Sequence, residues 1–450
     1  MSAPSASTTT PIKSSTTAGI AGTKLHPELL PGKYSGQGED KGSKPGWKRP
    51  ISWALAIFTV INLGLAQVSS IQQERSARSA GGDFWTNPAL IDLAIKEYKA
   101  QKPPANVVLL GSSLMMFPFW AMDASFDPKI ADIAHYHKSV ALQAVLEKNG
   151  IKNSSVFSLA SAGQMSSDAF LYASEFLKGD TKPEVVVWGI APRDFADDNV
   201  KSPMATVSFK QIVDLHNFSS YAKTFLPRFE DKAEFIANHS CFLYGRRWRF
   251  QKEADRTLEK ISAAVARVIV GKAADSKITA TGATAGGAAS LPAAATTTAT
   301  TAALSKDSAN TPDLSISSLL AGTAEQRWET STREYRGRYK NIAERDLSVQ
   351  MSCLDNTLKI CQERGIKVVL VNMPLTKLNQ GLMADGFYQR FNQQVKTLAS
   401  AYGKDVTLVD MTNQSQFQES DFWDTVHMNH IGGSKLIGGI LPAIRSYLNK

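Results

Sequence analysis

Short, almost fully apolar runs alternate with segments of helical periodicity along most of the chain. The five runs are 107–110 (VVLL), 156–159 (VFSL), 185–188 (VVVW), 368–371 (VVLV) and 406–409 (VTLV). Unbroken apolar runs of this length are typical of strands buried on both faces of a parallel sheet. Between them, apolar residues recur at spacings of three and four, as in the stripe from Leu347 to Cys361. The pattern predicts a three-layer α/β domain with a five-stranded parallel sheet.

A longer apolar segment, Ile51–Val68 (ISWALAIFTVINLGLAQV), carries no charge. As a helix it would reach about 27 Å, enough to cross the hydrocarbon of a bilayer. Lys41, Lys44, Lys48 and Arg49 precede it, so the positive-inside rule places the N-terminus in the cytoplasm and the main domain outside. We expect a single-pass anchor in the cell membrane. A cleaved secretory signal is the main alternative. The long leader before the segment and the poor match to a signal-peptidase cleavage site argue against it. A buried core helix would need flanks able to cover it, and these flanks are polar.

The remaining patterns divide the chain into segments. Residues 1–50 are rich in Ser, Thr, Gly and Pro and predict a disordered cytoplasmic tail. Residues 51–68 are the expected transmembrane anchor, and 69–104 form a connecting helical segment. Residues 105–450 form the α/β domain. Within it, we expect a helical insertion at 206–270 and a low-complexity loop at 271–325, which is dominated by Ala, Thr, Gly and Ser.

Charge and cysteine content narrow the functional classes. The formal net charge is +9, from 50 Lys and Arg against 41 Asp and Glu, and it is not gathered in one block. We therefore expect no nucleic-acid partner. Cys353 and Cys361 would lie about 12 Å apart along one helix, too far to pair with each other. At most one disulfide, through Cys241, is compatible with the three cysteines.

Candidate chemistry lies where the predicted strands end. Ligands of α/β sheets bind at the carboxyl ends of the strands. The first run ends in Gly111-Ser112-Ser113, and "DFWDTVHMNH" precedes the last helical segment. A serine hydroxyl needs a base to become nucleophilic, and His427 can serve, with Asp424 holding its other ring nitrogen. The backbone N–H groups of Ser113 and Gly163 can then bind the oxyanion.

These residues resemble the SGNH, or GDSL, hydrolase superfamily. That family has Gly-Asp-Ser-Leu after its first strand, where this chain has Gly-Ser-Ser-Leu at 111–114. Its C-terminal D-x-x-H matches Asp424 to His427, and its second-block glycine corresponds to Gly163. The resemblance implies a flavodoxin-like sheet. The Gly-Ser-Ser variant and the anchor are most similar to the extracytoplasmic branch, which includes alginate O-acetylation proteins and the D-alanyl transfer protein of teichoic acid synthesis.

One departure from the family concerns the oxyanion hole. The third block of the family carries Gly-x-Asn, but here Gly189 is followed by Ile190, Ala191 and Pro192. Loss of one such donor typically costs about 10² to 10³ in rate. Arg193 can supply the missing positive charge, or Asn372, after the fourth run, can supply a donor. The hole can also work with two donors, or the protein can be a weak or silent catalyst.

Two other interpretations compete with these roles. Asp424, His427 and His430 have residue types that bind zinc, although His430 would share their face only in a helix. We expect no metal site and no cofactor. Arg193 and Asp194 can form a simple local ion pair instead of a substrate-binding group.

Together these patterns predict a serine-dependent acyl-ester hydrolase or O-acyltransferase outside the membrane. The resemblance implies an acylated cell-envelope polysaccharide as substrate and an integral-membrane acyltransferase as partner. The alternative is a catalytically weak or silent protein of the same fold that assembles the envelope or binds its polymers.

Overall fold

The computed structural model describes residues 50–77, 88–130, 132–200, 202–226, 228–245, 247, 322–413 and 415–448. The expected N-terminal tail, apart from Pro50, and most of the low-complexity loop lie outside these residues. The chain separates into two compact units, Met1–Ile57 and Phe58–Lys450. Of the first unit, only the beginning of helix α1 belongs to the described residues.

The five apolar runs form one parallel sheet, which confirms the predicted α/β fold. The strands are β1 (Val107–Leu110), β2 (Val156–Ser158), β3 (Val185–Ile190), β4 (Lys367–Asn372) and β5 (Val406–Asp410). Their order is β2-β1-β3-β4-β5, and every neighbouring pair is parallel. The order reverses between β1 and β3, and such switch points are where ligands of open α/β sheets bind.

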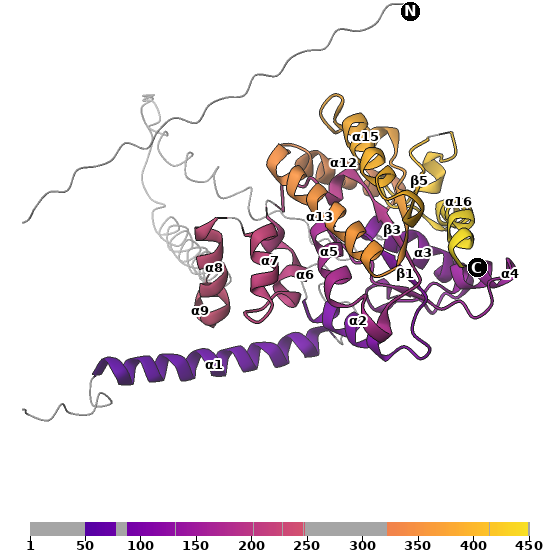
Figure 1. Cartoon of the computed structure of the whole chain (residues 1–450). Coiled ribbons are helices and arrows are strands. Elements are labelled where there is room, and N and C mark those ends of the chain that lie inside the picture. The colour runs from indigo at the N-terminus through magenta and orange to yellow at the C-terminus, as the bar shows by residue number, and fades with distance from the viewer. Residues whose placement is uncertain are drawn as a thin grey trace, which may run out of the picture. The chain divides into compact units, whose positions relative to one another are not determined.

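Helices cover both faces of this sheet (Figure 1). One face carries α3 (Ser113–Phe126), α4 (Val140–Lys148) and α16 (His430–Leu448). The other carries α5 (Ser166–Glu175), α13 (Glu344–Glu363) and α15 (Phe387–Ser400). Right-handed crossovers in this strand order place helices in this arrangement. The core strands β1 and β3 are buried along their whole length, as their continuous apolar sequence predicts.

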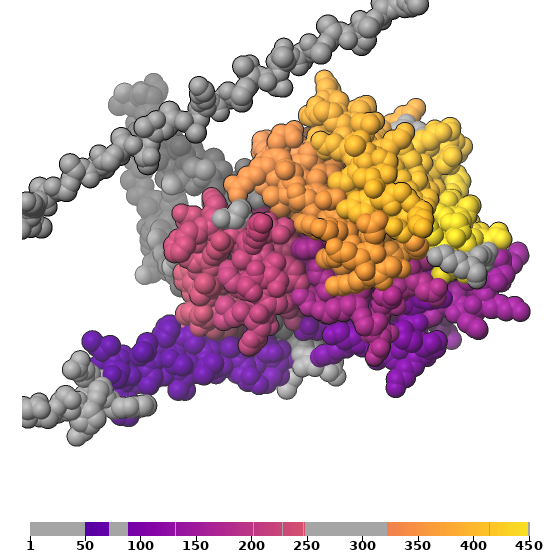
Figure 2. Space-filling view, viewed as in Figure 1, coloured from indigo at the N-terminus to yellow at the C-terminus, as the bar shows by residue number. Residues whose placement is uncertain are grey.

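The remaining helices lie around this core. They are α2 (Pro88–Ala100), α6 (Val207–Ile212), α7 (Phe218–Phe225), α8 (Phe229–Ser240), α9 (Phe242–Gly245), α12 (Ala324–Arg338) and α14 (Lys377–Gln380). Helix α6 packs on α2 and α5, and α7 packs on α13. Phe209 of α6 stacks edge-on against Phe225 and Phe235, which joins α6 to α7 and α8. In Figure 2 the described residues of α7 to α9 form one continuous block beside the sheet domain.

Helix α1 (Pro50–Ala77) contains the long apolar segment. Pro50–Ile71 is long and apolar enough to cross a membrane, and it is the one such helix in the described part of the chain. Its large side chains are exposed: Ile51 is 80% and Val60 69% accessible. The chain therefore has an N-terminal apolar helix of the kind found in signal anchors and signal sequences.

Candidate active site

Three of the predicted residues, from two distant parts of the sequence, form one chain of hydrogen bonds. The Oγ of Ser113 lies 2.9 Å from His427 Nε2. On the other side of the ring, His427 Nδ1 lies 2.7 Å from Asp424 Oδ2. The side chains of His427 and Asp424 are only 5% and 4% exposed. This arrangement of hydroxyl, imidazole and carboxylate is the geometry that activates a serine for nucleophilic attack.

Close backbone packing explains the small residues before Ser113. Gly111 has a φ of +133°, and a Cβ there would lie 2.5 Å from the carbonyl oxygen of Gly189 on β3. Its N–H donates to Gln164 Oε1 at 2.6 Å, and its carbonyl accepts from Ser161 N at 3.0 Å. Only glycine tolerates both this conformation and this contact. The chain thus turns sharply at the switch point and begins α3 with Ser113.

A tight turn holds His427 in place. Asp424 Oδ1 accepts from the backbone N–H groups of Val426, at 2.8 Å, and His427, at 2.9 Å. The Phe117 ring, one turn after Ser113 on α3, packs on the imidazole with centroids 4.5 Å apart. Burial alone would raise the pKa of Asp424, but the facing His427 and these two N–H groups hold that pKa below its ordinary value. The carboxylate is therefore ionised and can stabilise an imidazolium.

Two backbone N–H groups are available as oxyanion donors. Ser113 is the first residue of α3, so its N–H belongs to the free amides at the positive end of the helix. Gly163 adopts a left-handed φ of +74°. Within the described residues, neither N–H donates a hydrogen bond. These are the two donors predicted from the sequence.

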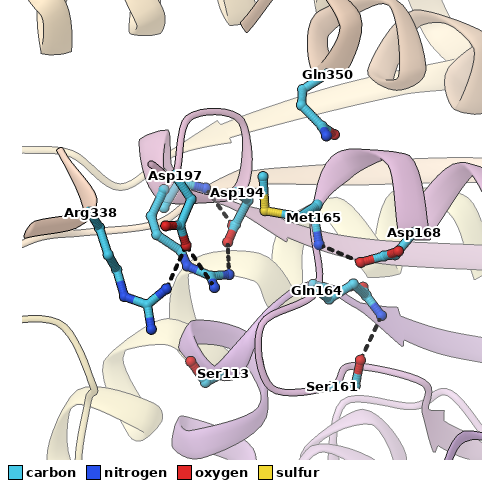
Figure 3. Close-up of polar contacts among 12 residues, drawn as sticks. Ser113, Ser161, Gln164, Met165, Asp168, Asp194, Asp197, Arg338 and Gln350 are labelled. Carbon is cyan, nitrogen blue, oxygen red and sulfur yellow. Dashed lines mark hydrogen bonds and ion pairs between the residues drawn. The ribbon is translucent and has the colours of Figure 1, made fainter. Parts of the chain in front are cut away.

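Arg193 is buried in a short helical turn, η4 (Pro192–Asp194), which follows β3. The predicted pair with Asp194 is present but long, at 3.6 Å. A closer ion pair joins Arg193 Nη2 to Asp197 Oδ2 at 3.1 Å, and Arg338 of α12 contacts the same Asp197 oxygen (Figure 3). Nη2 of Arg193 would lie 3.6 Å from a Cβ on Gly163, so the guanidinium stands beside that candidate donor.

Asn372 makes its contact away from the triad. Its side-chain Nδ2 donates to Asn392 Oδ1 of α15 at 3.1 Å. Helix α15 covers the sheet face opposite to the one that carries α3 and α16. The alternation of side chains along β4 explains this direction, because neighbouring residues point to opposite faces. Among the described residues, no hydrogen bond joins Asn372 to Ser113 or His427, and its role as an oxyanion donor stays a prediction.

The metal interpretation gains no support from the geometry. Asp424 Oδ2 is engaged by His427, and His430 is the exposed first residue of α16. In the described ranges, no group of three His, Cys, Asp or Glu side chains could hold a metal ion.

Gln164 was not singled out by sequence reasoning. Its Oε1 accepts from Gly111 N, while its Nε2 donates to the carbonyl of Leu159 at 3.0 Å. It therefore joins the ends of β1 and β2 and fixes the turn that carries Ser113. Figure 3 shows its further contact with Ser161. Its position directly after Gly163 was the only signal available. Arg338 was also missed, since its contact with Asp197 spans 141 positions.

Comparison with known proteins gives a family without a described activity. Residues 91–431 match the family described as "Protein of unknown function (DUF1574)". No curated protein matches the chain. The match covers β1 to β5 and all three residues of the hydrogen-bonded chain. Because it extends over most of the sequence, the chain belongs to the DUF1574 family.

Proposed function

We propose that the protein is a serine-dependent acyl-ester hydrolase or O-acyltransferase of the SGNH type. The observation that carries the proposal is the buried sequence of contacts from Ser113 Oγ through His427 to Asp424. These residues come from the first strand end and from the segment before the last helix, as in the SGNH pattern. The position of Ser113 at the β1–β3 switch point also supports the proposal.

The geometry allows a two-step acyl transfer. His427 Nε2 removes the proton of Ser113 as Oγ attacks the acyl carbonyl. The negative charge on the carbonyl oxygen is stabilised by the N–H groups of Ser113 and Gly163. His427 then gives its proton to the departing alcohol, and an acyl-enzyme remains. Water or a sugar hydroxyl, deprotonated by His427, attacks the acyl-enzyme and releases Ser113.

The substrate class and the location of the reaction rest on the SGNH resemblance and on helix α1. An anchor preceded by positive charges would hold the domain at the outer face of the membrane. There the enzyme would act on acylated cell-envelope polysaccharide. An integral-membrane acyltransferase would be a suitable partner for supplying acyl groups.

A second candidate function is a silent envelope-assembly protein with the same fold. The absence of an Asn after Gly189 favours it, because the third oxyanion donor of the SGNH pattern is missing. The buried guanidinium of Arg193 beside Gly163 offers a replacement charge, which favours the enzyme.

A fluorophosphonate probe distinguishes the two functions. Such probes react with serines activated by a base. The full chain, purified in detergent, should be labelled, while Ser113→Ala should not be labelled and His427→Ala only weakly. Ser125→Ala, which changes an exposed serine at the far end of α3, is the matched control and should be labelled like the parent. Equal labelling of the parent and Ser113→Ala, or none of either, would refute the enzymatic function.

A further inference from the structure

A large cavity lies next to the proposed active site. Its volume is about 1100 Å³. Met116, one turn after Ser113 on α3, lines it together with Gly163 and Gln164. Ligand pockets are commonly about 300–1,000 Å³ and hold drug-sized molecules. The cavity is therefore far larger than an acetyl group requires.

The walls of the cavity favour an apolar occupant. Apolar side chains from α1, α2, α8 and the segment before α6 line it: Leu63, Leu90, Ile91, Ala94, Met204 and Phe235. Several charged side chains along it are already engaged in ion pairs or hydrogen bonds. Arg247 binds Glu234 at 2.8 Å and Asn238 at 2.9 Å, and Lys210 Nζ donates to the carbonyl of Ala205 at 2.9 Å. Ionic groups that are already paired provide little attraction for a charged ligand.

One wall belongs to the candidate membrane helix. Asn62, Leu63 and Ala66 line the cavity and fall within Pro50–Ile71. Asn62 fixes this wall, since its Oδ1 accepts from Leu243 N of α9 at 3.0 Å. The cavity thus extends from the element that would lie in the bilayer to the residues beside Ser113. A ligand that is itself held in the membrane can enter along this wall.

From these contacts, and resting on the proposed function, we infer that the cavity receives the long acyl chain of a membrane-resident acyl ester. The ester carbonyl then lies at Ser113. The Oγ–carbonyl bond forms, the bond from the carbonyl carbon to the lipid's alcohol oxygen breaks, and the Ser113 proton passes through His427 to that oxygen. The acyl donor is a lipid ester, and the acceptor is water or a sugar hydroxyl.

The inference can be tested with two fluorophosphonate probes, one carrying a methyl group and the other a dodecyl group. Both are applied to the full-length protein in detergent. We expect the dodecyl probe to label Ser113 at least about tenfold faster, since each buried methylene adds binding energy. Ala94→Phe and Ala205→Trp, which fill the cavity from α2 and from the segment before α6, should reduce this preference to within about twofold. Ala205 is exposed, so its variant should fold even if Ala94→Phe does not.

Ala100→Phe provides the matched control, because Ala100 is exposed on α2 and does not line the cavity. It should keep the full chain-length preference. Equal labelling by the two probes, or a preference that both cavity variants retain, overturns this inference alone. No labelling by either probe overturns the proposed function and this inference with it.

Discussion

Helices α1 and α3 are both strongly apolar, yet they occupy opposite environments. In α3, residues from Ser113 to Ala121 are all buried, and Phe117 and Phe119 are 1% and 2% exposed. In α1, the share of the candidate span that is buried is only 6%. Apolar composition alone therefore does not determine where a helix lies. The presence of covering elements does.

Helix α3 is covered by close backbone packing of its neighbour α16. Helix α16 approaches it so closely that a Cβ on Gly433 would lie 2.5 Å from the Pro118 carbonyl oxygen. The buried helix then presents Ser113 and packs Phe117 on the catalytic candidate His427. The exposed apolar surface of α1 has no comparable cover among the described residues, and a bilayer would supply it. In the proposed function, one apolar helix would carry the nucleophile, and the other would determine where the reaction takes place.

The largest expected effect is on the site that α3 supports. His427→Ala removes the base and should lower ester hydrolysis by at least about four orders of magnitude. Asp424→Asn should lower it by about 10⁴, because the imidazole loses the partner of Nδ1. Steady-state rates with a 4-nitrophenyl ester measure both losses. A rate within tenfold of the parent for either variant, with an unchanged melting temperature, would argue against the triad.

A charge placed in each helix tests the comparison itself. Phe119→Lys puts an ammonium among buried side chains of α3 and should destabilise the fold by more than about 4 kcal/mol. Val60→Lys puts it on the exposed face of α1. It should leave the melting temperature of the detergent-purified chain within a few degrees but weaken membrane insertion, at a cost of about 3 kcal/mol at mid-bilayer. If Val60→Lys lowered the melting temperature as much as Phe119→Lys, the contrast would fail.

Substitutions at two glycines of α16 test how closely that helix packs on α3. Gly433→Ala introduces a methyl group against the backbone of Pro118 and should cost about 1–3 kcal/mol. Gly438→Ala, in the same helix but with open space around it, should stabilise the fold by about 0.5–1 kcal/mol. Denaturant unfolding of the two variants gives both values. The same sign for both changes would contradict close packing at Gly433.

Burial also leaves a signature in the pH dependence of stability. Burial lowers the pKa of His137 to about 4, partly opposed by the carbonyl of Ser158. Between pH 4 and 6.5, the ordinary pKa of histidine, the unfolded chain therefore binds more protons than the folded chain. The free energy of unfolding falls as the pH drops through this range. For this half-buried ring we expect about 1–2 kcal/mol. His137→Asn should remove that part of the pH dependence in unfolding titrations, and an unchanged slope would contradict it.

Local pattern was sufficient to predict the sheet and the approach of Ser113 to His427 and Asp424. The apolar runs became β1 to β5 because a strand covered on both faces needs no polar alternation. Ser113, Asp424 and His427 could be predicted because strand ends of a parallel sheet meet at one edge.

Contacts that depend on side-chain direction could not be predicted. Asn372 is the last residue of β4, and its amide donates to Asn392 of α15. The contact of Arg338 with Asp197 and the bond from Gly111 to Gln164 join residues with no common local motif. Such contacts follow from three-dimensional packing between distant segments, which spacing along the chain does not encode.

The most direct test of the proposed nucleophile is peptide-level mass spectrometry after fluorophosphonate treatment of the full chain. We predict a single covalent adduct on Ser113, strongly reduced when the chain carries His427→Ala, with the neighbouring Ser112 unmodified. An adduct on Ser112 or another serine, or equal modification of Ser113 without His427, would contradict it.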